Sequence, residues 1–273
     1  MPGASVRRLE DRAAIVIPAR FGSSRFPGKP LVALRGARGE AKSLIRRSWE
    51  AARLVSHVSD IVIATDDVRI EAEATSFSGT TILTSTGCRN GTERCWEAVQ
   101  RGDLGAELII NLQGDAPLTP PLAVEAVIEA LLEDRKAQVA SAMIKCSPVL
   151  LARLLADQRR GSVGGTTVVF DQDRDALYFS KRVIPFVPER CIDAPVYLHL
   201  GLYGYRREAL ARYAALPPSV LEENEGLEQL RFLHAGIKIR MVEIPEPPGG
   251  LWEINNPADV VPVEAGLVER GLH

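Results

Sequence analysis

Short apolar segments rich in β-branched residues alternate with helical patterns along the first half of the chain. The apolar segments are AAIVIPA, DIVIATDD, TTILTS and ELIINLQGD, and the patterns that follow them predict helices over 43–56, 68–76, 91–101 and 121–135. Continuous apolar strands separated by helices are typical of a parallel sheet that is covered on both faces. The pattern therefore predicts an α/β fold with a doubly wound, mostly parallel sheet.

The alternation loosens after residue 138. The segments QVASAMIKCS, TTVVFDQDRDALYFSK and VYLHLGLYGYRR predict strands of a mixed or antiparallel extension. Residues 153–165 and 185–195 are expected to be surface connections. We therefore predict a core formed by residues 1–138 with 224–273, and a smaller mixed-sheet lobe inserted at residues 139–223.

Composition narrows the function classes. The 273 residues suffice for a core domain with a smaller lobe, and 33 Lys and Arg against 35 Asp and Glu give no general electrostatic reason to bind nucleic acid. The chain has four cysteines, which are Cys88, Cys95, Cys146 and Cys191. They form no CxxC pair, which argues against a zinc site and against a disulfide framework, and a reducing cytoplasm fits best. The apolar run at 13–17 is too short for a signal peptide, and no segment approaches the roughly 20 apolar residues of a membrane span. We expect a cytoplasmic protein with neither nucleic-acid nor membrane partners.

Three cations follow the first predicted strand, in the segment IPARFGSSRFPGKPL. Ligands of open α/β sheets bind at the carboxyl ends of the strands, and Arg20, Arg25 and Lys29 lie at such an end among small residues. Small residues let backbone N–H groups approach phosphate oxygens, and three cations can neutralise a triphosphate. The segment has neither the Walker A spacing nor GxGxxG. It is interpreted as a phosphate-binding loop, the alternative being an ordinary solvated basic loop.

A single carboxylate follows the buried strand in ELIINLQGDAPL. Asp115 lies there beside Gln113 and Gly114, and a carboxylate at this place can hold Mg²⁺ against nucleotide phosphates. The alternative is a turn-forming Asp after Gly. Together with the basic loop, the motif indicates a nucleotide site.

Two predicted helix starts carry polar residues. In RNGTERCWEAV, Asn90 and Gly91 precede a helix whose N-terminus and Arg94 can face a base or a phosphate; the alternative is a capped helix with a solvated Arg. In IATDD, the paired carboxylates Asp66 and Asp67 can suggest a metal site. We favour a structural role for this pair, because both residues suit the N-cap of the next helix.

Eight motifs in the same order carry a resemblance to a known family. They are IPARFGSSRFPGKPL, IVIATDD, NGTER, IINLQGDAPL, DALYFSKRVIPF, HLGLYGYRREAL, LEQLRFLHAGIKI and NNPADV, and they extend over nearly the whole chain. The sequence resembles the 3-deoxy-manno-octulosonate (Kdo) cytidylyltransferases. The resemblance implies a Rossmann-like nucleotidyltransferase that moves CMP from CTP onto a sugar acid, with Mg²⁺ as cofactor, in lipopolysaccharide biosynthesis. It also implies a homodimer formed through the inserted, acceptor-binding lobe.

The resemblance also implies roles for individual residues of this sequence. The catalytic residues would be Arg20, Arg25, Lys29 and Asp115. CTP would contact Ala19, Arg20, Ser24, Arg25, Lys29, Asn90, Gly91, Thr92, Arg94 and Gln113. The acceptor would contact Lys181, His199, Tyr203, Glu228 and Gln229. The metal would be held by Asp115 and Asn255.

The sequence departs from the family pattern at positions that concern the metal and the acceptor. Asn255 stands where the family has the aspartate of a VDTP-like segment, and its amide brings no charge, unless Glu253 two residues away substitutes. Thr167 stands where the family commonly has Lys, Leu198 where it has a basic residue, and Lys181 where it has Arg. Each change alters how an anionic acceptor is held.

Several alternatives stay open at this point. The acceptor can be Kdo, its amino-sugar version, another nonulosonate-type acid or a small phosphonate. A nucleotidyltransferase for sugar 1-phosphates would show a GxGxRL-type start, whereas this chain has PARFGSSRFPGKPL. Asn255 leaves open a catalytically idle nucleotide-binding homologue, although the intact Arg20, Arg25, Lys29 and Asp115 argue against it. No residue is assigned as a general base.

Overall fold

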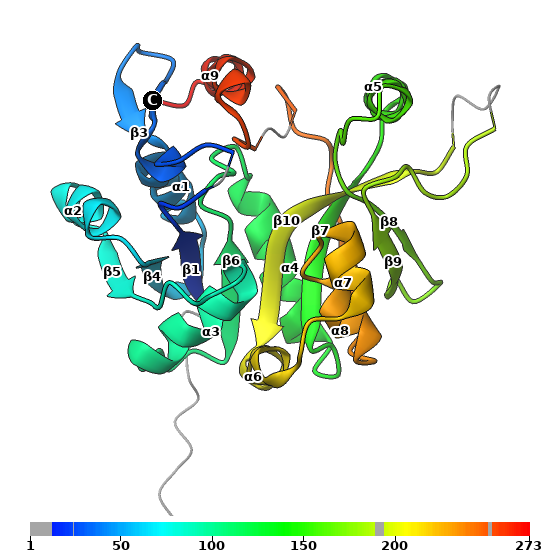
Figure 1. Cartoon of the computed structure of the whole chain (residues 1–273), viewed down its shortest axis with the longest axis horizontal. Coiled ribbons are helices and arrows are strands. Elements are labelled where there is room, and N and C mark those ends of the chain that lie inside the picture. The colour runs from blue at the N-terminus through cyan, green and yellow to red at the C-terminus, as the bar shows by residue number, and fades with distance from the viewer. Residues whose placement is uncertain (1–12, 24, 189–193, 251–252) are drawn as a thin grey trace, which may run out of the picture. The chain divides into compact units, whose positions relative to one another are not determined.

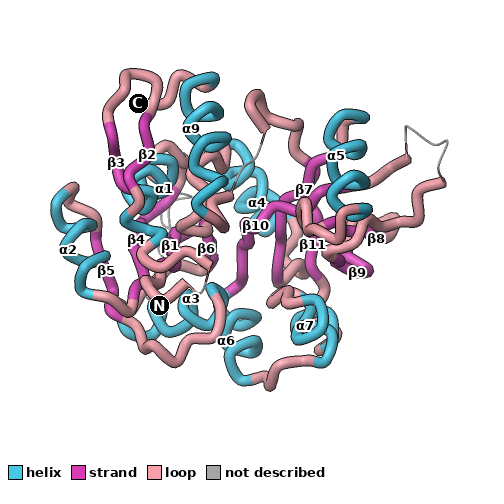
Figure 2. Tube along the Cα trace, turned by 45° about the horizontal axis from the view of Figure 1, so that its top comes forward, coloured by secondary structure: helices cyan, strands magenta, loops and turns pink. Residues whose placement is uncertain are grey.

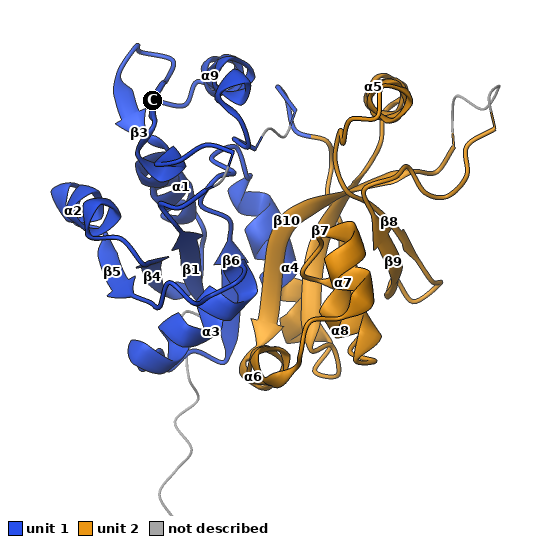
Figure 3. Cartoon of the chain, in the orientation of Figure 1, with its two compact units in different colours: residues 1–128, 247–273 blue, residues 129–246 orange. Residues whose placement is uncertain are grey.

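The computed structural model describes residues 13–23, 25–188, 194–250 and 253–273. The chain forms two compact units, coloured separately in Figure 3. The first unit comprises residues 1–128 with 247–273, and the second comprises residues 129–246.

Four parallel strands form the centre of the first unit (Figure 1). In spatial order, they are β6 (Leu108–Leu112), β1 (Ala13–Ala19), β4 (Val58–Thr65) and β5 (Thr80–Leu83). Ile15, Val16 and Ile17 of β1 are fully buried, as are Ile109 and Ile110 of β6. The strands β1 and β6 are almost entirely apolar, as is typical of parallel strands whose two faces are both covered.

Helices separate the strands of the first unit, and a short ribbon accompanies them. The helices are α1 (Leu44–Ala52), α2 (Val68–Ser76), α3 (Gly91–Arg101), α4 (Pro121–Glu133) and α9 (Val260–Glu269). Helix α4 ends in the second unit. The ribbon consists of β2 (Ala33–Arg35), which pairs with β3 (Ala41–Ser43). Ser43, Asp67 and Asn90 cap α1, α2 and α3, each accepting a hydrogen bond from a backbone N–H of the first turn. Such caps satisfy N–H groups that have no partner within the helix. The predicted N-cap role of Asp67 is confirmed.

The C-terminal segment packs against the rest of the first unit, to which it belongs. Ile254 is fully buried in an apolar cluster with residues of β2, α1 and α9, namely Leu34, Leu44, Val263 and Leu267. Its backbone N–H donates to the carbonyl oxygen of Asp115 at 2.9 Å. The short 3-10 helix η3 (Pro257–Asp259) follows and leads into α9. This packing brings residues 253–256 to the loop that follows β6.

The second unit contains a mixed sheet, whose strands are drawn in magenta in Figure 2. Strand β7 (Val139–Lys145) pairs with antiparallel β10 (Tyr197–Arg206) and with parallel β11 (Ile239–Glu243); β8 (Thr167–Phe170) pairs antiparallel with β10 and with β9 (Ala176–Ser180). The helices are α5 (Pro148–Arg159), α6 (Arg207–Ala215), α7 (Val220–Glu225) and α8 (Leu230–His234). The predicted fold class, a mostly parallel α/β core with a smaller mixed extension, is confirmed.

The structure differs from the sequence-based prediction in two places. Residues 153–165 were expected to form a surface connection, but α5 occupies 148–159, with Ser147 as its N-cap and the Leu residues at 150, 151 and 154 buried. That prediction was wrong because these leucines bury one face of a helix. The bounds of the two parts also differ, because residues 129–138 and 224–246 belong to the second unit. For the latter segment the reason is that β11 is paired with β7 along its whole length. Of the predicted connection at 185–195, residues 189–193 lie outside the described part.

Among the described residues, no helix combines the length and the apolarity needed to cross a bilayer.

Candidate active site

The ends of β1 and β6 meet closely in the first unit. A Cβ atom on Gly114 would lie 2.8 Å from the backbone carbonyl oxygen of Pro18, so a side chain at this position would clash. Ser48 of α1 also donates a hydrogen bond from Oγ to the Gly114 carbonyl, at 3.0 Å. Sequence reasoning singled out neither contact, although a glycine directly after a buried strand is a signal of close backbone approach. The contact places Asp115 beside the loop that follows β1.

The basic loop joins this carboxylate through Lys29. The Lys29 Nζ lies 2.5 Å from Asp115 Oδ2, and the two side chains are 14% and 25% exposed. Lys29 begins the 3-10 helix η2 (Lys29–Leu31), and Gly28 before it has a φ of 69°, a left-handed conformation that favours glycine. The two residues, predicted from separate motifs to be catalytic, are therefore brought together in one ion pair.

Two further oxygen-bearing side chains, those of Asn255 and Glu253, lie near Asp115. Asn255 Oδ1 accepts a hydrogen bond from Arg25 Nη2 at 3.0 Å, and Glu253 lies two residues before Asn255. Part of Glu253 reaches solvent, but its carboxyl is packed among protein atoms. Loss of hydration, followed by repulsion from Asp115, raises the pKa of Glu253 to about 7, against the opposing attraction of Lys29.

This donor set fits a divalent cation. Mg²⁺ binds through one or two carboxylates together with substrate phosphates, and carboxylate and amide oxygens are suitable ligands. The described residues hold no preformed group of three or more His, Cys, Asp or Glu side chains placed as metal ligands. Asp115, Glu253 and Asn255 instead give two carboxylates and one amide, which is a set that a bound triphosphate can complete.

The start of α3 lies beside the loop after β6. A Cβ atom on Gly91 would lie 3.1 Å from Gln113 Nε2 and 3.4 Å from Asn111 Nδ2. The side chain of Asn90 accepts from the Glu93 N–H at 2.9 Å as the helix cap, and Thr92 is fully buried. Three of the predicted CTP contacts, Asn90, Gly91 and Gln113, are therefore in one place, with no side chain at residue 91 to fill the space.

Arg94 has structural partners. It is 3% exposed, its Nη2 lies 2.8 Å from Asp66 Oδ2, and its Nη1 donates to Thr84 Oγ1. Since Asp66 follows β4 and Thr84 follows β5, this guanidinium ties α3 to two strand ends. A nucleotide contact by Arg94 stays a prediction.

The remaining predicted CTP contacts lie around the end of β1. Ala19 is buried as the last residue of the strand, and Arg20 after it is exposed. Ser24 lies outside the described residues. A phosphate contact by Arg20, whose side chain is open to solvent, stays a prediction.

The predicted acceptor residues all belong to the second unit. His199 of β10 is buried, its Nε2 lies 2.8 Å from Ser141 Oγ, and its ring centroid is 5.4 Å from that of Tyr203. Lys181, just after β9, is exposed, and its Nζ would be 2.8 Å from a Cβ atom on Gly226. Sequence reasoning did not identify Ser141, because a buried serine in a strand carries no distinguishing signal.

Gln229 presents a buried donor that lacks a protein partner. Its residue is 2% exposed, and its Nε2 has no hydrogen-bond partner among the described residues. Leaving such a group unpaired costs about 1–3 kcal/mol, and an unpaired group in a folded protein calls for an explanation. An oxygen atom of a bound ligand that accepted a hydrogen bond from this Nε2 would remove that cost. Glu228 precedes Gln229 and is half-buried.

Two departures from the family pattern serve the packing of the second unit. Thr167 Oγ1 donates to the Arg182 carbonyl at 2.6 Å and accepts from the Ile184 N–H at 3.1 Å. Leu198 is 8% exposed and lies over Gly165, where a Cβ atom would be 2.5 Å from it. Neither position offers a cation to an acceptor.

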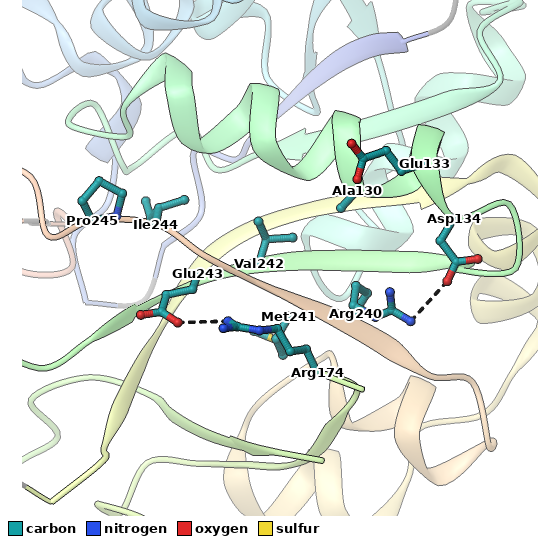
Figure 4. A pocket seen from close by; sticks show the side chains of 10 residues that line it. All are labelled: Ala130, Glu133, Asp134, Arg174, Arg240, Met241, Val242, Glu243, Ile244 and Pro245. Atoms are coloured by element: carbon teal, nitrogen blue, oxygen red, sulfur yellow. Dashed lines mark hydrogen bonds and ion pairs between the residues drawn. The ribbon is translucent and has the colours of Figure 1, made fainter. Parts of the chain in front are cut away.

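A separate pocket of about 650 Å³ lies along β11 in the second unit. Four of its charged side chains form two ion pairs, as Figure 4 shows: Arg174 with Glu243, and Arg240 with Asp134. Arg240 also pairs with Asp175 at 2.9 Å. Because both arginines are neutralised, and because none of the predicted site residues lines this pocket, we do not assign it to the reaction.

The burial of His199 has a consequence for pH. Burial lowers the pKa of this imidazole to about 3, whereas the unfolded chain takes up the proton near pH 6.5. The unfolded state therefore binds more protons below pH 6.5, and folding stability falls as the pH is lowered. When the pH is lowered from 7 to 5, we expect the titration of His199 to reduce the free energy of unfolding by about 2 kcal/mol.

Urea unfolding at the two pH values measures this loss. The His199→Gln protein is expected to lose about 2 kcal/mol less than the wild type over the same interval. Equal losses in the two proteins would show that His199 does not titrate in this way.

Comparisons with known proteins agree on one family. The cytidylyltransferase family profile matches residues 14–239. The 3-deoxy-manno-octulosonate cytidylyltransferase of Maricaulis maris is 45% identical over 256 residues, covering 94% of this chain and 97% of that protein. The enzyme of the same name from Escherichia coli is 37% identical, covering 95% and 97%. A solved structure of CMP:2-keto-3-deoxy-manno-octonic acid synthetase complexed with CTP matches with a TM-score of 0.80 at 36% identity, covering 95% of this chain and 99% of that one.

The parallel sheet with a basic loop and a carboxylate at its carboxyl edge is thus that of a nucleotidyltransferase of the cytidylyltransferase class. Within this class, the chain belongs to the 3-deoxy-manno-octulosonate cytidylyltransferase family. The family predicted from the ordered motifs is therefore confirmed.

Proposed function

We propose that this enzyme transfers CMP from CTP to 3-deoxy-manno-octulosonate and releases pyrophosphate. The observation that carries the proposal is the convergence of Lys29 and Arg25 with Asp115 and Asn255 at the carboxyl edge of the first unit's sheet. Membership of the family, at 45% identity to a named relative, supports the choice of CTP and of this sugar acid.

The reaction is an in-line displacement at phosphorus. The oxygen of the acceptor's anomeric hydroxyl forms a bond to the α-phosphorus, the bond from that phosphorus to the bridging oxygen breaks, and pyrophosphate leaves with the electron pair. The hydroxyl proton passes to solvent, since no side chain is assigned as its base. Arg20, Arg25 and Lys29 position the triphosphate and stabilise the charge that develops on the leaving group.

Mg²⁺ is the proposed cofactor. Asp115 and Asn255 would hold it through a carboxylate and an amide oxygen, next to Lys29 and Arg25. When bound, a divalent cation supplies positive charge that neutralises phosphate oxygens and orients the triphosphate. The side chains near this position bear the oxygen ligands that Mg²⁺ prefers.

The second unit supplies the proposed acceptor contacts. Lys181, His199, Tyr203, Glu228 and Gln229 would face the sugar acid. The unpaired Nε2 of Gln229 favours this assignment, because a hydroxyl or carboxylate oxygen of the acceptor can accept its hydrogen bond. Lys181 contributes a positive charge suited to an acidic acceptor.

Pyrophosphate release with CTP, Mg²⁺ and a panel of acceptors tests the function. We expect turnover with Kdo, and slower or no turnover with amino-Kdo, sialic-type acids and simple phosphonates. A CTP-binding protein that turns over none of these acceptors would be the idle homologue.

In Gln229→Leu, the KM for the acceptor should rise about tenfold, since a lost hydrogen bond costs about 1–1.5 kcal/mol. The KM for CTP should not change.

We further propose that the enzyme is a cytoplasmic homodimer formed through its second unit. Phe186 is 87% and Leu177 is 61% exposed, and large apolar side chains on a surface favour association. Cys88, Cys95 and Cys146 are free thiols, as a reducing compartment favours. Sedimentation equilibrium should give twice the chain mass, and a monomer at micromolar concentration would overturn this proposal.

A further inference from the structure

We infer that Glu253 is the second anionic ligand of the divalent cation and supplies the charge that the amide of Asn255 lacks. This inference rests on the proposed function, because it concerns the metal that accompanies CTP. It goes further by assigning a ligand of this chain's own that compensates for the uncharged Asn255.

Backbone contacts fix the segment that carries Glu253. The N–H of Ile254 donates to the carbonyl of Asp115 at 2.9 Å, and the Ile254 side chain is fully buried. One residue later, the N–H of Asn255 donates to Asp259 Oδ2 at 2.8 Å. The segment is therefore held directly beside Asp115 by contacts that do not involve the Glu253 side chain.

The side chains on either side of Ile254 point to one place. Because the side chain of Ile254 fills the apolar core, the side chains of its two neighbours, Glu253 and Asn255, lie away from that core. Asn255 is in turn bonded to Arg25 at 3.0 Å, while Asp115 is bonded to Lys29 at 2.5 Å. Glu253 thus shares a single cluster with the two proposed metal ligands and with two cations of the basic loop.

The charges of this cluster favour a divalent cation. Glu253 and Asp115 repel each other, and Lys29 and Arg25 compensate for them in the absence of nucleotide. A triphosphate would attract these two cations, and the two carboxylates would then need another counter-charge. Mg²⁺ supplies it and accepts carboxylate oxygens as ligands. With Asp115 and Asn255 alone the cation would meet one negative protein charge; with Glu253 it meets two.

The competing interpretation is that Glu253 is only an ion-pair partner of Arg25 and Lys29. In that case its removal would change the affinity for CTP equally with and without metal. A metal ligand instead affects the part of the CTP affinity that depends on Mg²⁺. The two roles are therefore separated by a binding measurement that requires no turnover.

Calorimetric titration of CTP into the full chain, once in EDTA and once in Mg²⁺, measures the CTP affinity without and with the metal and so distinguishes the two roles of Glu253. The Mg²⁺-dependent gain is the ratio of the CTP affinity in Mg²⁺ to the CTP affinity in EDTA. We expect this ratio to be about tenfold or more smaller in Glu253→Gln than in the wild type, since even outer-shell partners of metal ligands contribute 10–100-fold. The affinity in EDTA should be unchanged or higher, because one negative charge has gone. The double variant Glu253→Gln with Asn255→Asp should recover the gain, and it also shows that the substituted chain folds.

Glu269→Gln is the matched control, because Glu269 is an exposed carboxylate in the last turn of α9. It should retain the full gain. A Glu253→Gln protein that also retains it would overturn the inference, as would a wild type whose CTP affinity is indifferent to Mg²⁺. If the wild type shows the gain but turns over no acceptor, the proposed function fails while the role of Glu253 stands.

Discussion

Replacing Lys29 by Met is expected to lower kcat for CMP transfer about 100- to 1000-fold, the usual effect of removing one preorganised charge-stabilising donor. The ammonium group lies 2.5 Å from Asp115 in a half-buried position at the carboxyl edge of the sheet. There it can exchange the carboxylate for phosphate oxygens when CTP binds, and it can stabilise the charge of the departing pyrophosphate. Initial-rate measurements at saturating CTP, acceptor and Mg²⁺ give the value.

Lys42→Met is the control for this substitution. Lys42 pairs with Glu50 at 2.9 Å in the same unit, and its side chain is likewise 14% exposed. Its loss should leave kcat unchanged. If Lys29→Met were as fast as the wild type, or if both variants lost activity equally, Lys29 would have no specific part in the transfer.

Replacing Arg231 by Met is expected to destabilise the protein by about 3–5 kcal/mol, because breaking a buried pair leaves an uncompensated charge. Arg231 is 2% exposed and binds Glu222 through two bonds, Nε to Oε2 at 2.7 Å and Nη2 to Oε1 at 2.5 Å. Its guanidinium also lies 4.2 Å from the ring centroid of Tyr213. Chemical denaturation of the two proteins measures the difference in the free energy of unfolding.

A surface ion pair provides the comparison. Arg160 bonds to Asp157 at 2.7 Å but is 68% exposed, so Arg160→Met should cost less than about 1 kcal/mol. Since Arg231 joins α7 to α8 near Gln229, its loss should also raise the KM for the acceptor more than that for CTP. Equal stabilities of Arg231→Met and Arg160→Met would contradict the buried-pair account.

Local signals in the sequence were sufficient for the parallel strands of the first unit and for the helices between them, but not for the β2–β3 ribbon. The strands at its centre read as continuous apolar runs, and capping residues such as Ser43 and Asp67 mark the helix starts that the structure shows. The same kind of signal was overlooked at Ser147-Pro148, where α5 begins. The extent of the second unit could not be predicted, because it depends on the pairing of β11 with β7, which are separated by about a hundred residues.

The site was predictable where strand ends define it. Lys29 and Asp115 follow two strands that are neighbours in the sheet, so their meeting follows from the parallel arrangement alone. The burial of Arg94 against Asp66 and the unpaired amide of Gln229 depend on packing between distant segments. No local pattern of residues carries that information.

The joining of CMP to Kdo by this chain can be followed by ³¹P NMR of one reaction mixture. With the wild-type enzyme, CTP, Mg²⁺ and Kdo, the three triphosphate resonances should be replaced by one phosphodiester resonance and by pyrophosphate, with one pyrophosphate formed for each phosphodiester. Omitting Kdo should leave CTP intact. Persistence of CTP in the complete mixture, or release of pyrophosphate without a phosphodiester, would contradict the account.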